Sequence, residues 1–153
     1  MSELFHPDEL AMLDALVSET LEAQVEENPA VAAVERTSDQ PPSWYVRLSG
    51  EVKENYSAEL TLGQRSLHFE TYFIPAPEES LERFWRHLLV RNTKMYGMAF
   101  TVHDDGGVYI EGRLPNRLVA EPGEIDRILG SMFAYTEEMF MTAARIGFAS
   151  RFA

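Results

Sequence analysis

Hydrophobic side chains near the start of the chain recur at steps of three and four, which is the period of a helix with one apolar face. Pro7, Asp8 and Glu9 open this segment, and proline followed by acidic side chains is typical of a first helical turn. The Asn28-Pro29 pair is typical of a helix end. The pattern therefore predicts a helix from residue 7 to about residue 28. Its apolar stripe would be Leu10, Leu13, Val17, Leu21 and Val25.

The middle of the chain changes to a period of two, which is typical of strands with one buried face. Three segments show it clearly, at residues 44–49, 56–62 and 67–74. Residues 31–36 are a candidate for a further short strand. The connections are too short for parallel crossovers, so we expect an antiparallel sheet with one covered face and one polar face.

The helical period returns at residues 78–96, ending at Gly97. The expected apolar stripe of this second helix is Leu81, Phe84, Trp85, Leu88, Leu89, Met95 and Tyr96. A β-hairpin follows, because residues 98–102 and 108–114 flank an Asp-Asp-Gly-Gly tip that suits a tight turn. Pro122 opens a third long helix, from Gly123 to about Ile146.

These elements predict an α+β fold in the order α-β-β-β-α-β-β-α, with N-terminal, middle and C-terminal helices packed on an antiparallel sheet. The length of 153 residues suits a single domain over residues 1–153. The chain has no cysteine, no signal-peptide pattern and no apolar run long enough to span a membrane. We therefore expect a cytoplasmic protein without membrane association.

The net charge of −12 argues against nucleic acid as a partner, since phosphates are repelled. Residues 1–39 account for most of it, with ten acids and one base. Residues 83–103, in contrast, contain no acid. Their cations form one stripe on the second helix: Arg83, Arg86, Arg91 and Lys94. This stripe could bind an acidic protein partner or could be a solvated face, and the sequence favours neither.

Asn92 falls within the apolar stripe of the second helix, where a buried amide requires hydrogen-bond partners. It could contact a ligand. The better-favoured interpretation is that it binds backbone groups where the helix ends.

The third helix has an apolar stripe too wide for one ordinary contact face. One interpretation is a surface for a dimer or another partner, with Met132, Tyr135, Met139 and Met141 as candidates. The alternative is a core helix that lies deep over the sheet.

Catalytic and metal-binding patterns are weak in this sequence. Asp104 and Asp105 suit a hairpin tip, and the chain contains no nucleophile or phosphate-loop motif. His68 and Glu70 share one strand face, and His87 or His103 could join them, but a metal site needs three or four convergent ligands. We therefore expect no metal, no cofactor and no enzymatic activity.

Four segments of the chain resemble the YbjN family, described as bacterial sensory transduction regulators. They are LHFETYFIP at Leu67–Pro75, RNTKMYGMAF at Arg91–Phe100, VYIEGRLP at Val108–Pro115, and EIDRILGSMFAYTEEMF in the last helix. The pattern looks most like actinobacterial members. The resemblance implies a fold like that of type III secretion chaperones, which are small, acidic, often dimeric proteins that bind protein segments.

The sequence and the resemblance together predict a regulatory or chaperone-like protein-binding module. A homodimer and a protein partner of unknown identity are expected. The alternative is a sensor of a small molecule or phosphorylated ligand, using the sheet and Asn92.

Overall fold

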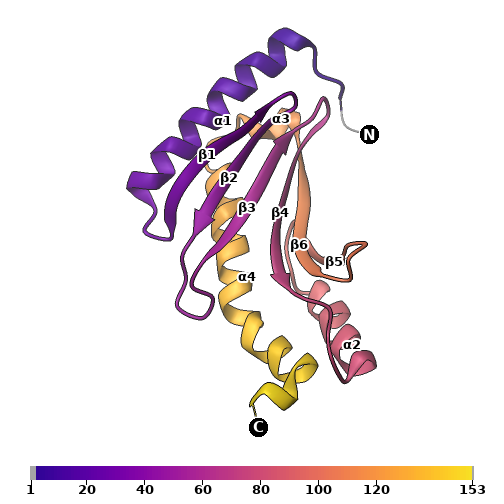
Figure 1. Ribbon diagram of the computed structural model, residues 1–153. Helices are drawn as coiled ribbons and strands as arrows, with labels where there is room; N and C mark the ends of the chain where they lie inside the picture. The colour runs from indigo at the N-terminus through magenta and orange to yellow at the C-terminus, as the bar shows by residue number, and fades with distance from the viewer. Residues whose placement is uncertain (1–2, 153) are drawn as a thin grey trace.

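A six-stranded antiparallel sheet forms the centre of the protein (Figure 1). The computed structural model describes residues 3–152. Along the chain the elements are α1 (Pro7–Glu27), β1 (Val31–Asp39), β2 (Pro42–Leu48), β3 (Tyr56–Leu62), β4 (Ser66–Ile74), α2 (Leu81–Asn92), β5 (Ala99–Val102), β6 (Val108–Pro115), α3 (Asn116–Val119), α4 (Glu124–Gly147) and the 3-10 helix η1 (Ala149–Phe152). The strand order is β1-β2-β3-β4-β6-β5, with every neighbouring pair antiparallel. The predicted fold class and the order of its elements are confirmed.

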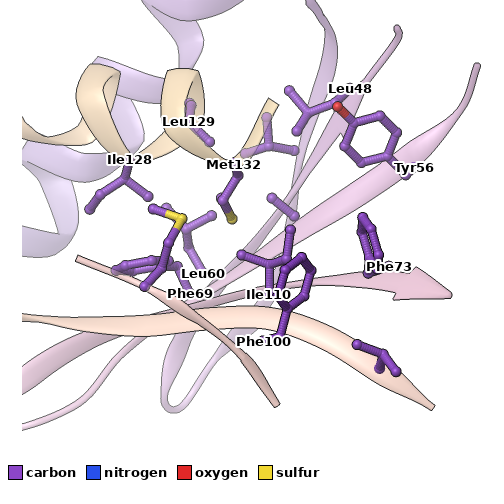
Figure 2. Packing of buried hydrophobic residues seen from close by; sticks show 14 of the residues in the cluster. Leu48, Tyr56, Leu60, Phe69, Phe73, Phe100, Ile110, Ile128, Leu129 and Met132 are labelled. Carbon is purple, nitrogen blue, oxygen red and sulfur yellow. The ribbon is translucent and has the colours of Figure 1, made fainter. Parts of the chain in front are cut away.

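The two faces of the sheet differ, as the period of two predicts. On one face the strands bury apolar side chains under α1 and α4, and Figure 2 shows Ile128, Leu129 and Met132 of α4 packed over Phe69 and Ile110 of the sheet. The opposite face carries polar and aromatic side chains that are half-buried or exposed over β3, β4 and β6. The sheet is therefore covered on one side only, and its other side is available to ligands.

Helix α1 follows the predicted stripe closely. Leu13, Val17 and Leu21 are buried against the sheet, while Val25 near the helix end is exposed. The indole Nε1 of Trp44 donates a hydrogen bond to Oγ of Ser18 at 3.1 Å, which attaches α1 to β2. Within residues 3–152, none of the helices has the length and apolar character that crossing a bilayer requires.

Strand β1 extends the candidate at residues 31–36 to nine residues, so a further strand precedes α2. It pairs with β2 with two register shifts, between Val31 and Ala33 and between Arg36 and Ser38. Such irregularities bend an edge strand and make it a poor template for pairing with another chain.

Helix α2 is shorter and more exposed than the sequence predicts. It begins at Leu81 rather than Glu78, because the backbone N–H groups of Glu78 and Glu79 donate to the carbonyl of Gly147 at the end of α4. Only Phe84 and Leu88 of its expected stripe are buried within the helix. The expectation of a largely buried stripe was therefore wrong for Leu81, Leu89 and Tyr96, which are all exposed.

Candidate functional site

The outer face of α2 presents apolar side chains to solvent. Leu89 is 66% exposed and Val90 46% exposed, although leucine and valine usually stabilise a fold by burial. They border a shallow groove of about 510 Å³. The groove is lined by Glu82, Trp85, Arg86, Leu89, Val90 and Thr93. We call these six residues the α2 groove.

The cations of the predicted stripe lie in and near the α2 groove: Arg86 lines it together with the acidic Glu82, and the others lie on the same helix or just beyond its end. Arg83, Arg86 and Lys94 are exposed, and none of them forms an ion pair within the described part of the chain. Arg91 is half-buried, and its Nε is buried without a hydrogen-bond partner among residues 3–152. Burial lowers the pKa of His87, and the nearby guanidinium groups of Arg91 and Arg83 lower it further. The predicted stripe is therefore a real cluster of positive charge.

Asn92 lies at the end of α2, where its amide binds the backbone of β5. Its Nδ2 donates to the carbonyl of Phe100 at 3.2 Å, and its Oδ1 accepts from the N–H of Phe100 at 2.7 Å. Both ends of the amide are thus engaged by one residue. The geometry matches the structural interpretation of Asn92 rather than the ligand contact.

The α4 residues expected at a dimer or partner surface are only partly available. Met132 is completely buried between α4 and the sheet (Figure 2), so its assignment to a surface was wrong. Tyr135 is half-buried, and its hydroxyl accepts a hydrogen bond from the N–H of Tyr96 at 2.7 Å. Met139 packs at the edge of the core, whereas Met141 is half-buried outside it. The wide apolar stripe is therefore explained mainly by burial over the sheet.

A cluster of histidines and carboxylates lies on the open face of the sheet. His68 and Glu70 on β4 meet Glu111 on β6 and His103 just beyond β5. The Nε2 atoms of His68 and His103 lie 2.8 Å from Oε2 and Oε1 of Glu111, respectively. His103 Nε2 is also 3.6 Å from Oε2 of Glu70. We call these four residues the open-face cluster; His87, the other predicted candidate, lies on α2 and is not part of it.

The two carboxylates of the open-face cluster differ in their electrostatics. Burial alone would raise the pKa of Glu111, but hydrogen bonds from Thr101, His103 and His68 lower it to about 2. Burial raises the pKa of Glu70, and the charges of Glu111 and Glu59 add to this effect against the opposing histidines. The hydrogen bond to Glu111 raises the pKa of His103. The carboxylate of Glu111 thus has hydrogen-bond partners on both oxygens, whereas Oε2 of Glu70 has none among the described residues.

The sequence alone did not identify Glu111 as part of this cluster. The alternation of apolar and polar residues over 108–114 places Glu111 on the polar face. Which residue of the neighbouring strand lies opposite Glu111 depends on the strand register, which the alternation does not reveal. The observed register sets Glu111 directly opposite Glu70.

A hollow of about 740 Å³ lies where the end of α1 meets the start of α4. Its lining includes the carboxylates of Glu27, Glu121 and Asp126 and no cationic side chain. A phosphorylated ligand is therefore a poor fit for it, because the charges would repel.

The fold and these surfaces define a small α+β domain with one covered sheet face, an open polar face and a basic, partly apolar helix. Over 115 residues, which are 75% of this chain, it is 32% identical to uncharacterized proteins of Mycobacterium tuberculosis and Mycobacterium bovis. Over 105 residues, 69% of the chain, it is 34% identical to an uncharacterized protein of Mycobacterium leprae. These matches cover 62% and 56% of the relatives, so the chain spans less than two thirds of their length. No protein-family model matches the chain.

Proposed function

We propose that this protein is a non-enzymatic protein-binding module that acts as a regulatory or chaperone-like factor in the bacterial cytoplasm, as the resemblance to the YbjN family and to type III secretion chaperones suggests. The observation that carries the proposal is the α2 groove, where exposed Leu89 and Val90 lie beside unpaired cations. Exposed apolar side chains gathered on one helix, rimmed by polar groups, are typical of a docking surface.

The chemistry of the α2 groove favours one kind of partner. Leu89 and Trp85 offer an apolar contact. Arg86 in the lining, with Arg83 and Lys94 nearby along the chain, offers more positive charge than Glu82 offsets. A segment of another protein with apolar side chains flanked by carboxylates is complementary on both counts. Positive charge on an otherwise acidic protein would also steer such a segment to this one face.

The alternative sensor function receives less support. Asn92, its proposed ligand contact, is engaged by Phe100, and the hollow between α1 and α4 is lined by carboxylates rather than cations. Binding of a peptide at α2 requires neither a free Asn92 amide nor a hollow lined by cations.

A partner-capture experiment tests the proposal. Purified wild-type protein is immobilised, and proteins from the native host that bind it are quantified by mass spectrometry at low and high salt. Replacing Arg83, Arg86 and Lys94 with Gln should weaken capture of acidic partners by about tenfold or more at low salt, since several exposed contacts of up to ~1 kcal/mol act together. The difference should shrink at high salt, where screening already weakens the wild type.

The matched control also changes three cations elsewhere on the surface, Arg47→Gln, Arg113→Gln and Arg117→Gln, all at exposed positions outside α2. A second variant, Leu89→Ser, removes the apolar contact without changing charge. Arg91 is left in place because it is half-buried. Undiminished capture by the first triple variant and by Leu89→Ser would mean that α2 is a solvated face.

A further inference from the structure

Three carboxylates lie side by side across the open face of the sheet. Glu59 on β3 is directly opposite Glu70 on β4, and Glu70 is directly opposite Glu111 on β6. Like charges at directly opposite positions destabilise a sheet. All three side chains are half-buried, so water screens them less than it screens surface charges. This row therefore requires positive charge nearby.

Two histidines approach this row, and the better-held of them is His103. The ring of His103 stacks on Tyr109 with centroids 3.6 Å apart and an interplanar angle of 13°. Its Nε2 points at the carboxylates, 2.8 Å from Glu111 and 3.6 Å from Glu70. The hydroxyl of Thr101 donates to Oε1 of Glu111. A hydroxyl and a stacked ring thus orient the nitrogen and oxygen atoms that converge here.

Glu70 is the group that the protein itself leaves unsatisfied. Its Oε2 is buried and has no hydrogen-bond partner among the described residues, and His103 Nε2, at 3.6 Å, is too far for a good hydrogen bond. A buried carboxylate oxygen without a partner is costly, and a bound cation would satisfy it. This observation is independent of the row of like charges.

The geometry points to a divalent metal site of the zinc class on the open face of the sheet, with Glu70, His103 and Glu111 as ligands and His68 as the fourth group. One ligand atom from each of the first three lies within 4.8 Å of the others. A tetrahedral zinc ion with bonds of about 2.0–2.1 Å holds its ligand atoms about 3.3–3.4 Å apart. The 2.8 and 3.6 Å separations from His103 bracket that spacing, so small side-chain movements suffice.

The ligand types decide among metals. Imidazole nitrogen suits zinc and related transition ions, whereas magnesium and calcium favour ligand sets made of oxygen. As the fourth group, His68 contacts Oε2 of Glu111 and orients that carboxylate toward the ion. From the sequence we expected no metal, because only His68 and Glu70 clearly shared a strand face, with His87 or His103 as possible additions. The fold brings His103 to the pair, adds Glu111, and leaves His87 on α2.

The site also has an entry path. A shallow hollow of about 320 Å³ reaches Glu70 and His103 from solvent. Its other lining residues are Tyr45, Ser57, Glu59, Tyr72 and Tyr109. An ion could enter without any movement of the backbone.

Zinc titration of tag-free, full-length protein tests the site. Native mass spectrometry and isothermal calorimetry should show one ion per chain with a saturable isotherm, and excess magnesium should not compete. Glu70→Gln, His103→Asn and Glu111→Gln should each weaken zinc binding at least tenfold. Glu138→Gln, at an exposed position of α4, and His87→Asn, on α2, are the matched controls and should bind as the wild type does.

A second measurement guards against variants that fail to fold. In the folded wild type, zinc should shift the NMR signals of the His103 ring and leave those of His87 unchanged. The inference is overturned if the wild type takes up no stoichiometric zinc, if magnesium competes equally, or if folded variants at the three ligand positions bind zinc as tightly as the controls. The result is separate from the α2 proposal, because the titration involves no protein partner.

Discussion

Lys53 lies in an environment that is unusual for a lysine, because its ammonium group is surrounded by backbone carbonyls and aromatic rings. Its Nζ donates hydrogen bonds to the backbone carbonyls of Tyr72 at 2.7 Å and Phe73 at 2.9 Å. It also lies 5.3–5.5 Å from the ring centroids of Tyr56, Tyr72 and Phe140. Burial lowers the pKa of Lys53 to about 8. The side chain therefore joins the β2–β3 loop to β4 with a charge that is partly lost just above neutral pH.

NMR titration can test this directly, because Lys53 and Lys94 are the two lysines of the chain. In a Lys94→Arg variant the single lysine side-chain signal should titrate with a midpoint of about 8. A Lys53→Arg variant assigns the signal by removing it. A midpoint near the ordinary lysine value of 10.5 would contradict the role of burial.

The same shift predicts a pH dependence of stability. The folded state releases the Lys53 proton at about pH 8, whereas the unfolded chain holds it until about pH 10.5. The unfolded state thus binds more protons in this window, so the free energy of unfolding contributed by Lys53 rises with pH from about 8 to 10.5 and falls as pH drops through 8. Urea unfolding of wild type against Lys53→Met should show the wild type gaining relative stability across this window.

Among the elements, α2 and β5 depend on one another through Asn92. Strand β5 is a four-residue edge strand, and the Asn92 amide engages the N–H and C=O of its Phe100. Asn92→Ala would leave those backbone groups without their partner and should lower the free energy of unfolding by about 1–3 kcal/mol. Urea denaturation measures this, with exposed Val90→Ala on the same helix as control, expected within about 0.5 kcal/mol of wild type. Equal stabilities for the two variants would contradict the structural role of Asn92.

Most helices and strands could be predicted from the sequence, whereas the start of α2 could not. The stripe of Leu13, Val17 and Leu21 and the alternation of β3 and β4 are local patterns, and the structure follows them. The start of α2 was misplaced because Glu78 and Glu79 bind the carbonyl of Gly147, almost seventy residues away. A local pattern carries no information about such a contact.

At the scale of the whole molecule, self-association remains a prediction. The two edges of the sheet are poor pairing surfaces, since β1 is irregular and β5 is short. We expect light scattering at micromolar concentration to give about twice the 17.4 kDa chain mass, because the resemblance to the YbjN family implies a homodimer. Met141→Ser on α4 should shift the population toward monomer, because Met141 is half-buried outside the core cluster.

Leu89→Ser is the informative comparison for the dimer. If α2 binds another protein and not a second copy of this chain, light scattering should give Leu89→Ser the same molar mass as the wild type. A monomeric Leu89→Ser variant would instead assign α2 to a second copy of the chain and contradict the proposed partner. If the wild type is monomeric over the whole concentration range, the prediction of a homodimer is wrong.

The sequence by itself did not determine the short helices α3 and η1, but it did determine the presence of α1, α2 and α4, the alternation of the strands, the one-sided sheet and the run of cations along and just after α2. Each of these follows from periodicity or charge over a few neighbouring residues, which backbone geometry converts directly into faces and stripes. The tertiary structure decided which apolar residues stay exposed, that Met132 is core, and that Asn92 binds Phe100. It also set Glu59, Glu70 and Glu111 in one row beside His103, because strand register and the approach of distant elements depend on packing across the whole fold.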